Sequence, residues 1–455
     1  MIQSKETNLG KDRVGRLFFA LAVPAITSQV VNALYNMVDR MYIGHIPGSG
    51  ASALTGVGVA FPLIMIISAF AALVSMGGAP RASIMMGKGD NEQANKILGN
   101  CFTALVITSV VLTAVTMIFC EPLLMMFGAS ENTIVYAKAY MMIYAAGTIF
   151  VQLTLGMNAF ISAQGFSRIS MLTVIIGAIT NIVLDPILIF GFNMGVRGAA
   201  FATVLSQAVS TVWVLQFLSG KKSQLKLHPK YFNIDAKILF PALALGVAPF
   251  IMQSTESLLV LCFNSSLLKY GGDLAVGAMT ILSSVMQFSM LPLQGLTQGA
   301  QPIISFNYGA GNIDRVKKAF HLLLASCLVY ATAMWALCML FPQMFAAIFT
   351  SDPALTQITV WALRIYIAAV FLMGAQLACQ QTFIALGNAK ISTFLALLRK
   401  IILLIPLIYI LPNFIENKVF AVFVAEPIAD TISVLVTITL FFRFFRAVEH
   451  EQIHA

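Results

Sequence analysis

Two stretches of the sequence are alike, and their likeness decides how the chain is organised. Residues 77–90 read GGAPRASIMMGKGD and residues 299–312 read GAQPIISFNYGAGN. At an offset of 222 the identical pairs are Gly77/Gly299, Pro80/Pro302, Ser83/Ser305, Gly87/Gly309 and Gly89/Gly311. The same offset aligns Lys96 with Lys318. The sequence therefore predicts two similar halves, each built around one copy of the stretch.

Outward from these stretches, long apolar segments alternate with short polar loops. Hydrophobic residues make up 59% of the 455 residues and charged residues only 10%, against about 25% charged residues in soluble proteins. A membrane span needs about 20 mostly apolar residues. The sequence predicts an all-α membrane protein with twelve transmembrane helices in two six-helix lobes. The predicted spans are 14–44, 54–80, 96–119, 132–155, 169–190, 196–218, 237–268, 274–304, 317–341, 355–385, 391–411 and 419–443.

The charge of the loops predicts the orientation of these spans. The chain has a net charge of +9, and most of its Lys and Arg residues fall on alternate loops. Cytoplasmic loops are enriched in Lys and Arg, so the protein is expected in the bacterial inner membrane with both termini on the cytoplasmic side. Six spans per half then give two lobes of the same orientation. The predicted divisions are a first lobe at 1–218, a cytoplasmic linker at 219–236, and a second lobe at 237–455 that ends in a short tail.

Polar side chains inside the first lobe predict a cation site. An ionisable residue within a span is costly and usually functional. The span 14–44 carries a polar stripe within about 80° of the helix surface, made of Gln29, Asn32, Asn36 and Asp39. Asn181 and Asp185 share one face of the fifth span, and Thr203 lies at a similar depth in the sixth.

Carboxylate, amide and hydroxyl oxygens of this kind suit Na⁺, or a shared proton, better than a transition metal. The predicted cation-binding residues are Asp39, Asn181, Asp185 and Thr203. The alternative is that the two aspartates are helix caps or packing hydrogen-bond partners, with Asp185-Pro186 managing a kink. No transition-metal site is predicted.

The second half carries a different polar pattern. Glu256 lies near the middle of the seventh span, and the eighth span carries a stripe of glutamines along one face. We expect these side chains to line a wet cavity together with the first-span amides; a tight polar seam between helices is the alternative. The predicted cavity residues are Gln29, Asn32, Asn36, Glu256, Gln287, Gln294 and Gln298. Charged residues of the last two spans, including Arg399, Lys400, Glu426 and Asp430, are expected to pair with one another.

Other classes of protein find little support in the sequence. The six cysteines are scattered through apolar segments and show no metal-ligand spacing. The chain contains no nucleotide-binding glycine loop and no His-rich metal motif. We therefore predict that it is not an enzyme, uses no cofactor, binds no nucleic acid and acts as a monomer among membrane lipids.

Several short motifs together resemble the multidrug and toxic compound extrusion (MATE) family, in particular its MepA-like and DinF-like bacterial members. In the first half they are AVPA (22–25), NMVD (36–39), IGH (43–45), GKGD (87–90) and NIVLDP (181–186). In the second half they are QGAQP (298–302) and NYGA (307–310). Each string is weak by itself, but the combination extends over nearly the whole chain.

The resemblance implies two lobes arranged as a V, with a central cavity open alternately to each side. It implies antibiotic efflux by antiport of cationic, amphipathic drugs against H⁺ or Na⁺, coupled at Asp39, Asn181, Asp185 and Thr203. Glu256 matches an acid used by some members, but the accompanying acid of the tenth span is missing here. A lipid-linked oligosaccharide flippase of the same superfamily is the alternative function.

Overall fold

The computed structural model describes residues 8–453, with side chains to residue 448, and within that range the chain is helical and contains no strand. The first half holds α1 (Val14–Gly44), α2 (Gly50–Gly87), α3 (Asn91–Ile118), α4 (Cys120–Met126), α5 (Ile134–Ala146), α6 (Thr148–Ala163), α7 (Ser167–Pro186), η1 (Ile187–Gly191) and α8 (Val196–Ser219). After η2 (Pro229–Tyr231), the second half holds α9 (Ala236–Gly309), α10 (Ile313–Leu340), α11 (Pro342–Phe349), α12 (Pro353–Tyr366), α13 (Val370–Ala385), α14 (Ala389–Leu397), η3 (Leu398–Leu404), α15 (Ile405–Ile410), η4 (Leu411–Asn413) and α16 (Lys418–Ile453).

The helices account for the twelve predicted spans. Nine described helices are long and apolar enough to cross a membrane, and two bent pairs raise the number to eleven. The pairs are α5 with α6, bent by 58°, and α12 with α13, bent by 47°. The 74-residue α9 has non-helical backbone angles at Gly272, and dividing it there gives the twelfth span. The predicted all-α membrane fold is confirmed, although the bends within the fourth and tenth spans were not predicted.

Gly272 allows α9 to be two spans. Its φ angle is +65°, a conformation that glycine adopts without the steric cost of a side chain. The turn at this position separates the seventh and eighth spans almost where the sequence predicted a loop, at residues 269–273. A β-branched residue at this position would be strained whatever space surrounds it.

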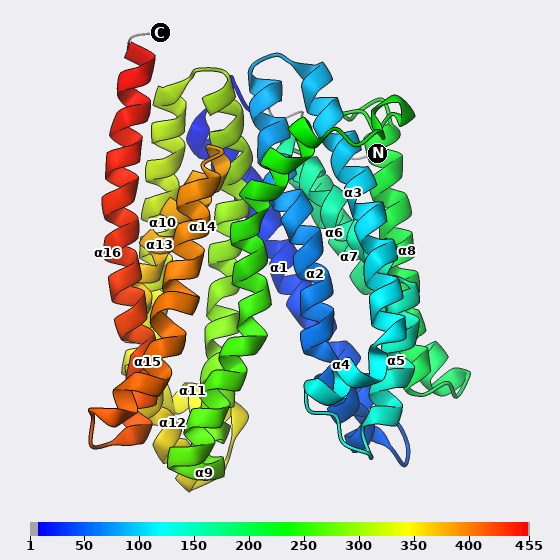
Figure 1. Ribbon diagram of the computed structural model, residues 1–455, viewed down its shortest axis with the longest axis vertical. Coiled ribbons are helices and arrows are strands. Elements are labelled where there is room, and N and C mark those ends of the chain that lie inside the picture. The colour runs from blue at the N-terminus through cyan, green and yellow to red at the C-terminus, as the bar shows by residue number, and fades with distance from the viewer. Residues whose placement is uncertain (1–7, 454–455) are drawn as a thin grey trace.

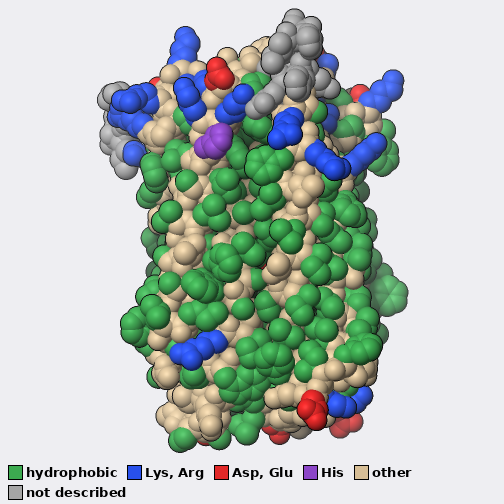
Figure 2. Space-filling view, turned by 90° about the vertical axis from the view of Figure 1, so that its left-hand side faces the viewer, with side chains coloured by type: hydrophobic (Ala, Val, Ile, Leu, Met, Phe, Trp, Pro, Cys, Tyr) green, Lys and Arg blue, Asp and Glu red, His purple; other side chains and the backbone are tan. Residues whose placement is uncertain are grey.

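The two halves form two bundles that meet near one end of the molecule and diverge toward the other (Figure 1). We call α1–α8 the first lobe and α9–α16 the second lobe. The N- and C-terminal ends lie at the same end of the molecule, and Lys and Arg side chains gather there above a broad apolar belt (Figure 2). We call this the basic end and its opposite the far end. Residues 1–7 and 454–455, at the limits of the predicted lobes, lie outside the described residues.

The lobes touch backbone to backbone near the basic end, at Gly246 and at glycines of the repeated stretches. A Cβ atom on Gly77 would lie 1.8 Å from the carbonyl oxygen of Ala242, and one on Gly246 would lie 1.7 Å from that of Leu73. These distances are far below van der Waals contact, so only glycine permits the two helices to approach this closely. We call the set of such contacts the glycine seam.

The seam repeats with the symmetry of the sequence. A Cβ atom on Gly87 would lie 2.0 Å from the Phe306 oxygen, and one on Gly309 would lie 2.0 Å from the Ile84 oxygen. Gly87 and Gly309 are equivalent at the 222-residue offset, as are Ile84 and Phe306. The two repeats therefore contact each other reciprocally, as in a two-fold interface.

Two segments outside the spans are held by hydrogen bonds to helices of the lobes. Arg315 of α10 donates to the carbonyl oxygens of Leu9 (3.0 Å) and Asp12 (2.7 Å), which fastens the N-terminal segment to the second lobe. The predicted linker is also fixed, because the Gln164 Oε1 atom accepts hydrogen bonds from Ser223, Gln224 and Leu225. The division into lobes at 1–218, 219–236 and 237–455 stays a prediction.

The glycine seam predicts a sharp contrast between two glycine substitutions in α2. Gly77→Ala should lower the free energy of unfolding by about 1–3 kcal/mol, because the new methyl group overlaps the Ala242 backbone. Gly58→Ala is the control, since nothing lies within 4 Å of its Cβ position, and it should be neutral or slightly stabilising. Thermal unfolding of the two purified variants checks this, and equal stability would contradict the seam.

Candidate functional site

Three of the four predicted cation-site residues come together in the interior of the first lobe. Helix α1 packs along α7, which brings Asp39 beside Asn181 and Asp185. Asp39 is 8% exposed and the other two are fully buried. The Asn181 Nδ2 atom donates to Asp185 Oδ1 at 3.4 Å, and the carboxyl groups of Asp39 and Asp185 lie close enough to interact electrostatically. We call these three residues the first-lobe carboxyl site.

Oxygens of this site lack partners. Asp39 Oδ1, Asn181 Oδ1 and Asp185 Oδ2 are buried and accept no hydrogen bond. Among the described residues no Lys, Arg or His forms an ion pair with either carboxylate. Two carboxylates at one site disfavour joint ionisation, so the arrangement suits a shared proton or a small hard cation such as Na⁺.

Local sequence explains how α7 presents its two site residues. Asn181 and Asp185 are four residues apart and therefore lie on one face of the helix. Pro186 follows at once and lacks a backbone N–H, and the chain continues as the π-helix η1. Single π-turns of this kind are common at functional sites.

Thr203 lies next to Tyr140, which in turn lies near the site and was not predicted from the sequence. The Thr203 hydroxyl lies 3.5 Å from the Tyr140 hydroxyl, and Tyr140 in turn lies close to Asp39. Tyr35 of α1 also lies near both aspartates. The spacing of Tyr136, Tyr140 and Tyr144, four residues apart in an apolar span, is the signal that could have indicated a tyrosine-lined face.

The first-span amides face the second lobe. Ala22 and Ile26 of α1 contact Gly299 and Gly295, and at about 100° per residue Gln29 and Asn36 fall on the same side of the helix, whereas Asn32 lies closer to the direction of Asp39. Gln29 and Asn36 are half-buried and Asn32 is exposed. Asn36 is held by a 2.7 Å hydrogen bond from its Nδ2 atom to the Asn32 carbonyl oxygen.

The glutamines of α9 belong to the second lobe. Gln294 and Gln298 lie on the face of α9 that also carries Gly309, which contacts Ile84 of the first lobe. Gln287 and Gln294 are exposed and Gln298 is half-buried. That the amide stripes of both lobes border one opening between α1 and α9, which we call the interlobe opening, stays a prediction.

Glu256 is not a free carboxylate. Its side chain is 59% exposed, and it forms an ion pair with Lys400 of η3, whose side chain is only 4% exposed. The Lys400 ammonium also donates to the Met252 carbonyl oxygen at 2.8 Å. Pairing of Arg399 with Glu426 and Asp430 is confirmed. Lys400, however, pairs with the seventh span rather than the twelfth, because it points toward α9.

The different exposure of the two partners predicts an asymmetric response to their removal. Glu256→Gln leaves a buried ammonium without its counter-ion and should cost about 1–3 kcal/mol of stability. Lys400→Met leaves a carboxylate that water already reaches and should cost less. The double variant should recover part of the loss of Glu256→Gln. Chemical or thermal unfolding of the three proteins measures these differences, and a larger cost for Lys400→Met would contradict the pairing.

Comparison with known proteins places the chain in a family. The family model described as MatE matches residues 24–187 and again residues 249–410. The chain is 22% identical over 421 residues to the multidrug export protein MepA of Staphylococcus haemolyticus (strain JCSC1435), covering 92% of both chains. It is 22% identical over 433 residues to MepA of Staphylococcus aureus (strain N315), covering 94% of this chain and 95% of that one. These relatives are named as export proteins, in agreement with the prediction that the chain is not an enzyme.

Solved structures share the fold. A crystal structure of MATE in the bent conformation superposes with a TM-score of 0.92 at 23% identity, covering 99% of both chains. A MOP superfamily transporter from Pyrococcus furiosus, described as having a binding pocket of reverse polarity that suggests a different function, gives 0.90 at 22% identity, covering 99% of this chain and 100% of that one. With twelve spans and family matches in both halves that together cover most of its length, this multi-pass membrane protein belongs to the MatE family.

Proposed function

We propose that the protein is an antiporter of the bacterial inner membrane that exports cationic, amphipathic small molecules in exchange for H⁺ or Na⁺. The observation that carries this proposal is the first-lobe carboxyl site, where two buried aspartates face each other and neither forms an ion pair with a basic side chain of the described residues. The similar MepA proteins, named as multidrug exporters, support export as the direction of transport.

The carboxylates of the second lobe differ from those of the first, and this difference supports ion coupling in the first lobe. Its intramembrane carboxylates already have cationic partners, since Lys400 pairs with Glu256 and Arg399 with Glu426 and Asp430. A carboxylate that already has a built-in cation has little affinity left for a transported one. We therefore place ion coupling at Asp39, Asn181 and Asp185, with Thr203 and Tyr140 completing their surroundings.

The arrangement of the lobes fits one half of an alternating-access cycle. With the basic end taken as cytoplasmic, the interlobe opening faces the outside, and the glycine seam closes the cytoplasmic side. A cation arriving from outside compensates one negative charge of the carboxyl pair, and α1 adjusts around Pro24, which lies within the helix. Each inward monovalent cation contributes about 2.3 kcal/mol per 100 mV of membrane potential.

The interlobe opening is suited to organic cations. Its amide side chains, Gln29, Asn32 and Asn36 from one side and Gln287, Gln294 and Gln298 from the other, carry no charge and accept or donate hydrogen bonds. A drug needs no fixed geometry at such a surface, which suits varied ligands.

A lipid-linked oligosaccharide flippase is the less favoured alternative. Such a substrate carries phosphates, which arginine and lysine clusters bind. Lys400 is buried and already paired, and Arg399 is bound by two carboxylates. The named residues of the opening therefore lack a free basic cluster, in contrast to what a phosphate-bearing substrate requires.

Neutralising the first-lobe carboxyl site should abolish export. Asp39→Asn and Asp185→Asn each remove a cation-binding carboxylate, so cells that express either variant at the wild-type level should lose resistance to organic cations. Glu131→Gln, at an exposed loop carboxylate, is the control and should keep full resistance. Growth in ethidium measures this, and resistance retained by both aspartate variants would refute the coupling site.

The coupling ion is identified by separate gradients. In liposomes containing the purified protein, ethidium transport should respond to one of two imposed gradients, either a pH difference or a Na⁺ difference. The responding ion should stop driving transport in the Asp39→Asn variant. Transport that ignores both gradients in the wild-type protein would contradict antiport itself.

A further inference from the structure

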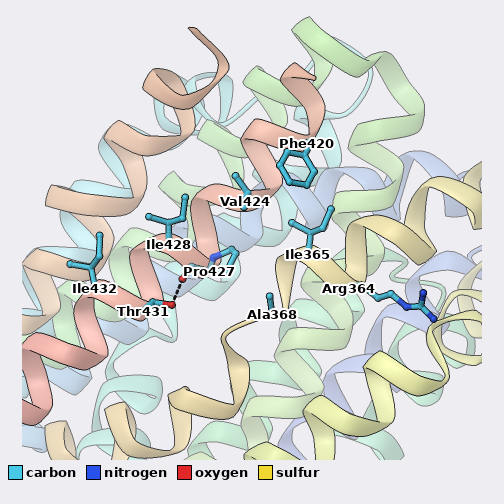
Figure 3. A pocket seen from close by; sticks show the side chains of 9 residues that line it. All are labelled: Arg364, Ile365, Ala368, Phe420, Val424, Pro427, Ile428, Thr431 and Ile432. Atoms are coloured by element: carbon cyan, nitrogen blue, oxygen red, sulfur yellow. Dashed lines mark hydrogen bonds between the residues drawn. The ribbon is translucent and has the colours of Figure 1, made fainter. Parts of the chain in front are cut away.

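Helix α16 has a polar face buried inside the second lobe, which the transport proposal above does not use. Glu426, Asp430, Ser433 and Thr437 lie within about 60° of one another on this face, and each is at most 5% exposed. The opposite face, with Val424, Ile428 and Thr431, lines an apolar groove of about 530 Å³ beside α12 (Figure 3). The polar face is therefore turned away from the membrane side of the helix.

Two carboxyl groups of this face share one guanidinium. The Arg399 Nε atom lies 2.6 Å from Asp430 Oδ1, and its Nη2 atom lies 3.1 Å from Glu426 Oε1. Two ionised carboxylates and one arginine would leave a net charge of −1. The side chains of Glu426 and Asp430 are 7% and 1% exposed, so water does not screen this charge.

The surrounding charges do not remove the excess. From η3, Lys400 is already matched by Glu256 of α9. From α12, the buried Tyr366 faces the same cluster and is neutral as a phenol. The whole group then holds three carboxyls against two cations. A buried uncompensated charge within a membrane is costly, so the group requires one further positive charge.

The polar face also carries unsatisfied atoms. Asp430 Oδ2, Ser433 Oγ and Thr437 Oγ1 are buried and have no hydrogen-bond partner. On α12, which packs against α16, Thr359 Oγ1 is equally buried and unpartnered. Buried polar groups without protein partners are commonly satisfied by internal water.

The unpartnered atoms of α16 follow one another along its buried face toward the basic end, and we call them the polar line. Phe383 of α13 packs on Phe441 of α16, with ring centroids 5.3 Å apart, and both helices run toward the basic end. Counting back two turns along both helices places Gln376, whose Oε1 atom is also unpartnered, at the level of Ser433 and Thr437. The polar line thus extends from the carboxyl pair toward the basic end.

We infer that Glu426 and Asp430 form a proton-binding site of the second lobe, in which one proton is shared by the two carboxyls beside Arg399 and is solvated by internal water along Ser433, Thr437 and Gln376. The proton makes the cluster neutral. It binds to a carboxylate oxygen as an O–H group. The site is separate from Asp39 and Asp185.

A proton fits this place better than a metal cation. Na⁺ and Ca²⁺ need several oxygen ligands around the ion, whereas Arg399 already occupies Asp430 Oδ1 and Glu426 Oε1. Among the described residues no group of three or more His, Cys, Asp or Glu side chains is arranged to hold a metal. A proton needs one free oxygen, and Asp430 Oδ2 offers it.

Infrared difference spectroscopy on the purified full-length protein tests the inference. The background is the Asp39→Asn/Asp185→Asn double variant, which removes the first-lobe carboxyls, so the result does not depend on the transport proposal. At neutral pH the carbonyl band of a protonated, buried carboxyl should remain and should shift in D₂O. Glu426→Gln or Asp430→Asn, added singly, should remove the band, because the remaining carboxylate then pairs with Arg399 alone.

Two further variants test whether the band belongs to the buried carboxyl pair. Glu416→Gln, at an exposed carboxyl in the loop before α16, should leave the band unchanged. Ser433→Ala should keep the band but move its frequency, because the hydrogen bonding of the carboxyl changes. Absence of the band from the double-variant background would overturn the inference, and so would its persistence in both Glu426→Gln and Asp430→Asn.

Discussion

A carboxylate inside a membrane must be given a positive charge, and the two lobes meet this requirement differently. In the second lobe the protein supplies most of the charge itself, from Arg399 and Lys400. In the first lobe no basic side chain of the described residues forms an ion pair with Asp39 or Asp185, although Arg40 lies near enough to Asp39 to interact electrostatically. Most of the compensating charge must then come from solution. A site that borrows its cation from solution can respond to an ion gradient. The proposed division of labour between the lobes follows from this difference.

The glycine seam joins the two similar halves of the chain at one end of the molecule only. Gly77, Gly246, Gly87 and Gly309 let the backbones of the two lobes meet near the basic end, while the two bundles diverge toward the far end (Figure 1). Contacts made by backbone and small residues allow one rigid bundle to move against another, as in transporters built from repeats. The same close approach makes the seam intolerant of larger side chains.

The sequence was enough to predict the twelve spans, because apolar length and loop charge are local properties. It also grouped Asp39 with Asn181 and Asp185, since each polar residue is conspicuous in an apolar span. The ion pair of Lys400 with Glu256 was missed, because it joins spans far apart in the chain and depends on the direction of each side chain. The bend between α5 and α6 was missed because Gly147 alone is a weak signal.

The central claim is that the first lobe couples to an ion because it lacks a built-in cation, and supplying one tests it directly. Asn181→Lys places an ammonium beside Asp39 and Asp185, whereas Asn181→Met adds a similar volume without charge. The measurement is gradient-driven ethidium transport by each variant in liposomes, for protein that remains monodisperse. The account predicts that Asn181→Lys abolishes the response to the gradient and that Asn181→Met keeps part of it. A wild-type response from Asn181→Lys would contradict the account.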